Sequence, residues 1–166
     1  GKRGSELWNI VKAAGMSYGI RPGAPNDKER IESGLVSYGA DGRLQANPCN
    51  PFEISLGKLV NFNKEDDFVG RAALLQIKAE GPKRRRVGYV ISCDAIPASQ
   101  HSLDVVNSKG EVVGILSEWI YSERFGSNVG VGMIINETID ISENLNITWE
   151  GQPYRVKIKE LPFIKV

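Results

Sequence analysis

Helical patterns separated by loops occupy the first half of the chain. Apolar residues recur at the spacing of one helix face from Leu7 to Ala14, Ser5 can cap the first turn, and Gly15 is a typical terminator. This pattern predicts an amphipathic helix over Ser5–Ala14, and we expect its apolar face to pack on a sheet.

A second, shorter helix is predicted just before a long loop. Asn26 or Asp27 can cap it, and Gly34 ends it after Ser33. From Leu35 to Pro51 the apolar spacing fits neither a helix nor a strand, and glycines and prolines punctuate the stretch. Long loops in compact domains are often functional, which makes this stretch a functional candidate.

A strand and a third helix are predicted next. Residues 59–62 suggest a strand, because three of the four are large and apolar. Asp66 or Asp67 then begins a helix with an apolar stripe, and Gly81-Pro82 ends it.

Past Pro82 the pattern changes to strand after strand, separated by short turns. In the last segment Tyr154, Val156 and Ile158 point to one face, while the charged residues between them point to the other. The candidate strands are residues 85–92, 103–107, 111–117, 128–135, 145–149 and 154–159. The sequence thus predicts an α+β chain with a domain boundary at about Gly81, followed by a small antiparallel barrel or sandwich.

Composition narrows the class of partner. The 21 Lys and Arg nearly balance the 20 Asp and Glu, and the net charge of +1 gives no electrostatic reason to expect nucleic acid or an anionic membrane. No apolar run approaches the roughly 20 residues that span a bilayer, so we expect a cytoplasmic protein. The chain opens on Gly1 and enters a helical pattern at once, as an excised piece of a longer protein would.

The familiar catalytic and metal-binding motifs are absent from the sequence. His101 is the only histidine and lies in a polar loop, and we expect Cys49 and Cys93 to be free thiols. No cluster of His, Cys and carboxylates has metal-ligand spacing, and P-loop, dinucleotide and nucleophile-elbow signatures are missing. We therefore expect no metal site.

Two polar segments in the first half are open to a functional and a structural interpretation. The dense polar helix Asn26–Glu32 either serves a ligand site or forms a solvated surface. Tyr38 and Asp41 lie in a glycine-bracketed loop, where backbone can approach a ligand closely. A half-buried tyrosine can equally serve as an anchor for such a loop.

Two further features belong to the strand-rich half. The basic run Lys83–Arg86 either contacts phosphates or polyglutamate or forms a solvated linker before a strand. Trp119 and Tyr121 lie beside Glu118 and Glu123, and aromatic rings with carboxylates can hold a cation. Plain packing is the alternative role for these rings.

Several segments, taken in order, resemble the glycine-cleavage T-protein family. Residues 25–41, PNDKERIESGLVSYGAD, are similar to the family's ARD-x-LRLEAG-x-x-LYG-x-D segment, and NPFE at 50–53 is similar to its NP-x-E element. FVGRAAL at 68–74 is similar to FIGREAL, and the strand pattern after Gly81 is similar to the family's terminal barrel. Each element is short, but their order over most of the chain is specific.

The resemblance implies three domains around a folate cleft. This chain would supply the end of the mixed α/β folate-binding domain, residues 1–81, and the C-terminal β-barrel domain, residues 82–166. Better known members of the family move a one-carbon unit to N5 of tetrahydrofolate. Their catalytic aspartate and pterin-binding glutamate lie before Gly1, so the resemblance assigns no catalytic residue to this chain. We expect it to be inactive without the N-terminal domains of the same polypeptide.

Departures from the family motifs bear on the substrate. Asn26 stands at the arginine of ARD, Lys58 replaces a tryptophan, and residues 117–119 read SEW in place of TSG. The motif wording is closer to the dimethylsulfoniopropionate demethylase-like branch than to glycine-cleavage proteins, and both branches remain open. The implied partners are folate and a small amine- or sulfonium-bearing substrate.

The resemblance suggests four cofactor-binding residues. Glu32, Tyr38 and Glu53 would line or brace the folate side of the cleft, and Trp119 would reach in from the barrel. Two other classes of function also fit the sequence. One is a noncatalytic folate-linked binding or interaction module, or the terminal segment of a larger folate-linked oxidoreductase, and the other is a structural all-β adaptor.

Overall fold

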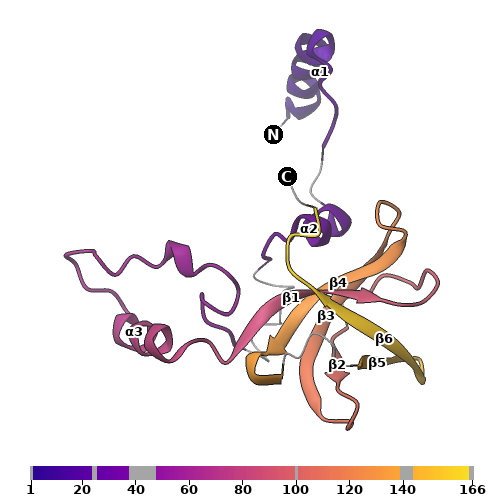
Figure 1. Ribbon diagram of the computed structural model, residues 1–166. Coiled ribbons are helices and arrows are strands. Elements are labelled where there is room, and N and C mark those ends of the chain that lie inside the picture. Colours follow the sequence, from indigo (N-terminus) through magenta and orange to yellow (C-terminus); the bar gives the residue numbers. More distant parts are fainter. Residues whose placement is uncertain (1, 24–25, 38–47, 100, 139–143, 165–166) are drawn as a thin grey trace.

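A closed barrel of six antiparallel strands forms the body of the molecule, with the strand order β1-β4-β3-β2-β5-β6 (Figure 1). The computed structural model describes the chain apart from residues 1, 24–25, 38–47, 100, 139–143 and 165–166. The strands are β1 (Arg84–Ile91), β2 (Leu103–Val106), β3 (Val112–Ser122), β4 (Ser127–Ile135), β5 (Leu145–Trp149) and β6 (Gln152–Lys159). The helices are α1 (Gly4–Gly15), α2 (Asp27–Ser33) and α3 (Arg71–Glu80), with short 3-10 helices η1 (Met16–Tyr18), η2 (Gly57–Leu59) and η3 (Asn136–Thr138). The predicted α+β class is confirmed, and the barrel alternative is the correct one.

All six strands predicted after Pro82 are present, and only β3 differs much in length from its prediction. The strand was predicted to end at residue 117, but it continues to Ser122. The prediction was too short because a β-bulge between Leu116 and Glu118 breaks the alternation on which it depends. The bulge leaves two consecutive polar side chains, Ser117 and Glu118, both buried.

The barrel interior is filled by aromatic and branched side chains from all six strands. Tyr89 and Trp119 are its largest fully buried members. The Trp119 ring meets the Trp149 ring edge to face, with their centroids 5.0 Å apart. The Tyr89 hydroxyl donates to the Met133 carbonyl at 2.9 Å, and burial raises the pKa of Tyr89 far above its ordinary value.

Helix α2 forms as predicted and packs on the outer face of β3 and β4. Asn26 caps it, with Oδ1 accepting from the Glu29 amide at 2.9 Å. Gly34 ends it in the left-handed conformation, at a φ of 68°. A side chain at Gly34 would also crowd Pro162, so this glycine lets the segment after β6 pass close to the helix end.

Helix α1 forms, but it does not pack on a sheet as expected. Within the described chain none of its residues is buried, and it stands away from the barrel beyond α2 (Figure 1). Arg3 takes the N-cap position without a side-chain cap bond, and Ser5 lies inside the helix. The expectation was wrong for a physical reason: an apolar stripe shows that a helix needs cover, and it does not say which segment supplies the cover.

The segment between α2 and the barrel contains a small aromatic cluster. The prediction of a strand over 59–62 is wrong, because none of these residues lies in a strand. Phe62 instead stacks on Phe52, with ring centroids 6.5 Å apart, and its ring centroid lies 6.3 Å from that of Phe68. Helix α3 begins later than Asp66, since Phe68 is held in this cluster. In the described ranges no α3 side chain is buried.

Candidate functional site

A ladder of contacts fixes α2 on the barrel. Three consecutive helix residues meet three residues that alternate along β3. Arg30 pairs with Glu118 and Glu32 with Ser122, and Ile31 between them shares a hydrophobic cluster with Ile120. Because alternate residues of a strand share a face, the β3 members form a row beneath the helix. One apolar contact between two polar ones therefore sets the position of α2.

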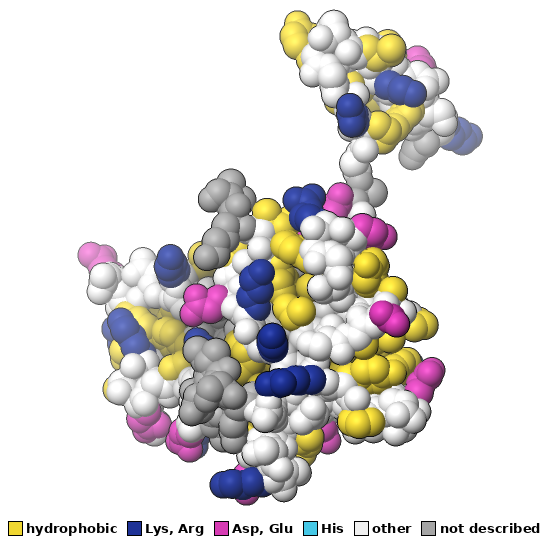
Figure 2. Space-filling model, turned by 45° about the vertical axis from the view of Figure 1, so that its right-hand side comes forward, with side chains coloured by type: hydrophobic (Ala, Val, Ile, Leu, Met, Phe, Trp, Pro, Cys, Tyr) yellow, Lys and Arg dark blue, Asp and Glu magenta, His cyan; other side chains and the backbone are white. Residues whose placement is uncertain are grey.

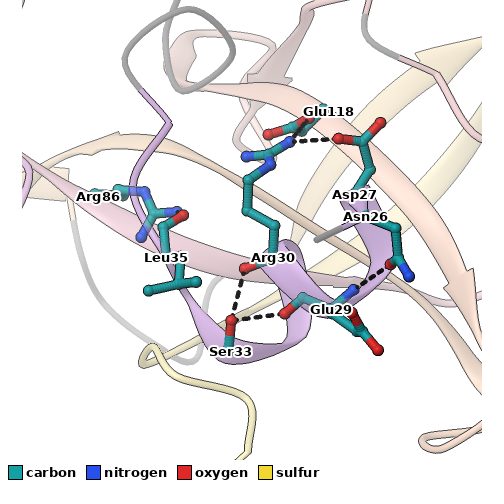
Figure 3. Close-up of polar contacts among 8 residues, drawn as sticks. All are labelled: Asn26, Asp27, Glu29, Arg30, Ser33, Leu35, Arg86 and Glu118. Carbon is teal, nitrogen blue, oxygen red and sulfur yellow. Dashed lines mark hydrogen bonds and ion pairs between the residues drawn. The ribbon is translucent and has the colours of Figure 1, made fainter. Parts of the chain in front are cut away.

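Arg30 forms a buried ion pair with the barrel (Figure 3). Its Nη2 donates to Glu118 Oε2 and lies 3.4 Å from Asp27 Oδ1. The Glu118 side chain is only 2% exposed, and its Oε1 is buried without a hydrogen-bond partner among the described residues. A carboxylate at that depth needs its counter-charge, so Arg30 and Glu118 hold each other in place.

The Glu32 carboxylate is held from two sides. Its Oε1 accepts from Ser122 Oγ at 2.6 Å, and its Oε2 lies 3.3 Å from Nε of Arg124, whose side chain is mostly exposed. The Glu32 carbonyl accepts from the Ile164 amide at 3.1 Å, which brings the C-terminal segment alongside α2. Although Glu32 is buried, it also borders an open groove along α2.

An open groove of about 760 Å³ runs along α2. Its charged lining consists of three carboxylates and two guanidinium groups, from Asp27, Glu29, Glu32, Arg30 and Arg124, and Ile164 of the C-terminal segment adds apolar surface. The groove reaches Ser37, the residue before Tyr38, and Tyr38 itself lies outside the described residues. Three carboxylates, the mostly exposed Arg124 and an apolar wall thus surround a space in the usual size range of small-molecule sites, roughly 300–1,000 Å³.

Glu53 belongs to a reciprocal turn. Asn50 Oδ1 accepts from the Glu53 amide at 3.1 Å, and Glu53 Oε2 accepts from the Asn50 amide at 3.0 Å. This is the geometry of a capping box, with Pro51 in the first position where no amide is needed. Arg84 Nε donates to Glu53 Oε1 at 3.0 Å, so the carboxylate also ties the turn to β1. Glu53 is buried by these contacts and does not line the groove along α2.

Three residues of the basic run Lys83–Arg86 belong to β1, and two of them, Arg84 and Arg86, are bound by other parts of the chain. Arg86 is buried, and it donates to the Gly34 and Leu35 carbonyls at 2.8 and 3.1 Å (Figure 3 labels Arg86 and Leu35). Arg84 binds Glu53. Positions 84 and 86 share the outer face of β1 because they alternate with the inward-facing residues, and this period of two was the signal available in the sequence.

Trp119 lies in the barrel core. Its side chain is fully buried, and its Nε1 donates to the Pro97 carbonyl at 3.0 Å. This burial agrees with the packing interpretation of the sequence and leaves no ring face toward the groove. The two neighbouring carboxylates do pair with cations, but the cations belong to the chain: Glu118 binds Arg30, and Glu123 binds Lys28.

Outside the α2 groove, the surroundings of the Cys93 thiol disfavour its reactive thiolate form. Burial, followed by the negative charge of Asp94, raises the pKa of the Cys93 thiol. His101 is exposed. In the part of the chain that the structure describes, no group of three or more His, Cys, Asp or Glu could hold a metal ion. None of the helices in that same part has the length and apolarity to cross a bilayer.

The fold and site define an antiparallel β-barrel domain that carries a docked helix and an open groove on its flank. Residues 84–165 match the glycine cleavage T-protein C-terminal barrel domain. Through this domain the chain belongs to the glycine cleavage T-protein family.

Curated relatives extend the likeness beyond the barrel. The chain is 39% identical over 131 residues to dimethylsulfoniopropionate demethylase DmdA of Ruegeria pomeroyi, covering 79% of this chain and 34% of that protein. It is 31% identical over 162 residues to the aminomethyltransferase of Bacillus subtilis, covering 96% of this chain and 43% of that protein. The chain therefore spans between a third and a half of the length of these relatives.

A solved structure supports the fold. The glycine cleavage system aminomethyltransferase T from Bartonella henselae superimposes with a TM-score of 0.69 at 22% identity, over 83% of this chain and 37% of that one. At this identity the likeness shows the fold alone. The resemblance to the family that the ordered sequence motifs indicated is confirmed.

Proposed function

We propose that this chain is the C-terminal part of a tetrahydrofolate-dependent one-carbon transferase, which moves a methyl or aminomethyl group. In this proposal residues 1–81 complete a folate-binding α/β domain, and residues 82–166 form its terminal barrel. The observation that carries the proposal is the groove along α2, because it lies in the segment whose motif resembles the family and has Glu32 and Arg124 side by side at its edge.

The residues of the groove fit the chemistry of a folate. A pterin ring presents hydrogen-bond donors and acceptors on one edge, and the glutamate tail carries carboxylates. Glu32 supplies acceptor oxygens, and the mostly exposed guanidinium group of Arg124 suits carboxylates, while Arg30 is already paired with Glu118. When bound, tetrahydrofolate would supply N5 as the acceptor of the one-carbon unit from a small amine- or sulfonium-bearing substrate.

The roles of the chain's own residues are to bind and to orient. Glu32 and Tyr38 are proposed to contact the cofactor, and Glu53 is proposed to brace the loop that carries Tyr38 through its bond to Arg84. Trp119 supports the barrel wall behind α2, since it fills the core beneath β3. Holding the reacting partners in a fixed geometry is a large part of catalysis for such a transfer.

Glu32→Gln in the full-length protein tests this assignment. We expect the dissociation constant of tetrahydrofolate to rise at least about tenfold, since a difference near 1.4 kcal/mol follows from the loss of one charge-assisted contact. Calorimetric titration gives the constant, and the exposed Glu65→Gln is the matched control. Unchanged affinity in Glu32→Gln, with an unchanged melting temperature, would make Glu32 scaffold only.

A further inference from the structure

The outer face of β6 carries a row of three cations. Arg155, Lys157 and Lys159 are all exposed, and they alternate with residues that pack against the barrel core. Alternate side chains of a strand lie on one face, roughly 7 Å apart. Figure 2 shows Lys and Arg side chains following one another down the middle of the body of the molecule. These three residues form the β6 cation row.

The chain itself does not neutralise the β6 cation row. The residues paired with the three cations on the neighbouring strands are all uncharged, namely Asn146, Val90 and Gly88. Among the described residues, no ion pair involves any of the three cations. Because the whole chain has a net charge of only +1, the row is a local excess of positive charge. Such an excess is complementary to a ligand that carries several negative charges in line.

The β6 cation row begins beside the groove along α2. The Lys159 Nζ lies 5.3 Å from the centroid of the Phe125 ring and 5.8 Å from that of the Phe163 ring. Each ring is next in sequence to a residue that lines the groove, Arg124 and Ile164 respectively. Cation-π contacts therefore hold Lys159 near the groove, and β6 leads from it away from α2 along the barrel (Figure 1).

We propose that the β6 cation row binds the poly-γ-glutamate tail of a folate held in the groove along α2. The inference rests on the proposed function, in which Arg124 meets the tail carboxylate of the first glutamate. Each γ-linked glutamyl unit adds one carboxylate, and its backbone is one bond shorter than the two strand residues that separate neighbouring cations. The carboxylates of an extended tail therefore recur at nearly the interval of the row, and two added glutamates meet Lys157 and Arg155.

A linear ligand fits the β6 cation row better than an acidic protein surface does. The row is a single line of side chains, whereas a stable protein interface buries roughly 800 Å² per partner. All three cations are exposed, so each contact with a carboxylate adds only a few-fold to the affinity and weakens as salt is added. The row thus serves as an extension of the binding site, and the groove remains the place where the folate ring is held.

Calorimetric titration of the full-length protein with the mono- and triglutamate forms of tetrahydrofolate tests the row. We expect the triglutamate form to bind about tenfold more tightly at low ionic strength, because two further ion pairs form, and to lose this gain at high salt. The double variant Arg155→Gln with Lys157→Gln should bind the two forms equally and keep the monoglutamate dissociation constant of the parent protein. The matched control, Lys64→Gln with Lys109→Gln, removes the same charge from exposed positions outside β6 and should retain the gain.

A charge-conserving double variant, Arg155→Lys with Lys157→Arg, should also retain the gain. Equal affinity of the parent protein for the two forms overturns the tail site, while monoglutamate binding leaves the proposed function standing. A gain that persists in the double glutamine variant of β6, or that is lost equally in its matched control, overturns the tail site as well. If neither form binds the parent protein, the folate function fails and the tail site fails with it.

Discussion

Replacing Arg30 by methionine is expected to lower the free energy of unfolding of the chain by about 3–5 kcal/mol. The substitution keeps a long apolar stem and removes the guanidinium that compensates Glu118, whose side chain is 2% exposed. The carboxylate would then be buried without a counter-charge, and the other oxygen has no hydrogen-bond partner among the described residues to take over. Urea denaturation followed by circular dichroism measures the change.

Lys28→Met is the matched control for this prediction. Lys28 pairs with Glu123 in the same helix-to-barrel seam, but the two side chains are 41% and 71% exposed, so its removal should change stability by less than about 1 kcal/mol. Combining Arg30→Met with Glu118→Met should recover most of the lost stability, because apolar replacement of a whole buried pair is often neutral. A loss below about 1 kcal/mol in Arg30→Met alone would contradict a buried, mutually dependent pair.

Gly132→Ala is expected to be the most damaging small substitution in the barrel, with a loss of roughly 3 kcal/mol or more from overpacking. A β-carbon at Gly132 would lie 1.9 Å from the Ile115 carbonyl oxygen and 3.0 Å from the Leu116 α-carbon, both of them backbone atoms of the paired strand. The backbones of β3 and β4 would have to move apart around this position. Differential scanning calorimetry should show a fall in melting temperature of about 6–12 °C.

Gly4→Ala is the control for Gly132→Ala. A β-carbon at Gly4 meets nothing within 4 Å, and alanine favours the helix in which Gly4 lies, so we expect no loss of stability. A melting temperature for Gly132→Ala within about 2 °C of the parent chain would show that β3 and β4 lie farther apart than described.

The barrel was predictable because its information is local. Strands alternate with period two, turn residues separate them, and the last strand shows Val156 buried between exposed Arg155 and Lys157. The α2 helix was also predictable, since Asn26 and Gly34 are strong boundary signals. The bulge at Ser117 was not, because one extra residue in a strand leaves no local mark and shifts every later side chain.

The features that the sequence did not predict depend on contacts between residues that lie far apart in the chain. The sequence suggested Glu118 beside aromatic rings as a cation site, but only the fold shows that Arg30, which lies 88 residues earlier in the chain, is its partner. Glu53 was expected near a ligand, and the Asn50 to Glu53 turn could have been recognised as a capping box from its spacing. The exposure of α1 could not be predicted from the sequence, because the local apolar pattern does not identify which segment covers the helix.

The contacts around α2 explain how the barrel could support the binding site proposed along this helix. Three charge pairs run from α2 to β3 and the turn after it: Lys28 to Glu123, Arg30 to Glu118 and Glu32 to Arg124. Arg86 fixes the chain at the end of the same helix. One wall of the groove is thus firmly attached to the barrel, and in the proposed function other parts of the polypeptide supply the facing wall.

Isothermal titration with tetrahydrofolate, run on the full-length protein and on the 166-residue chain side by side, tests this division most directly. We expect saturable binding with one site in the full-length protein and no measurable binding in the 166-residue chain, since only one side of the pocket is present there. Equal affinity in the two proteins would contradict a pocket shared with the rest of the polypeptide, and absence of binding in both would contradict the folate site itself.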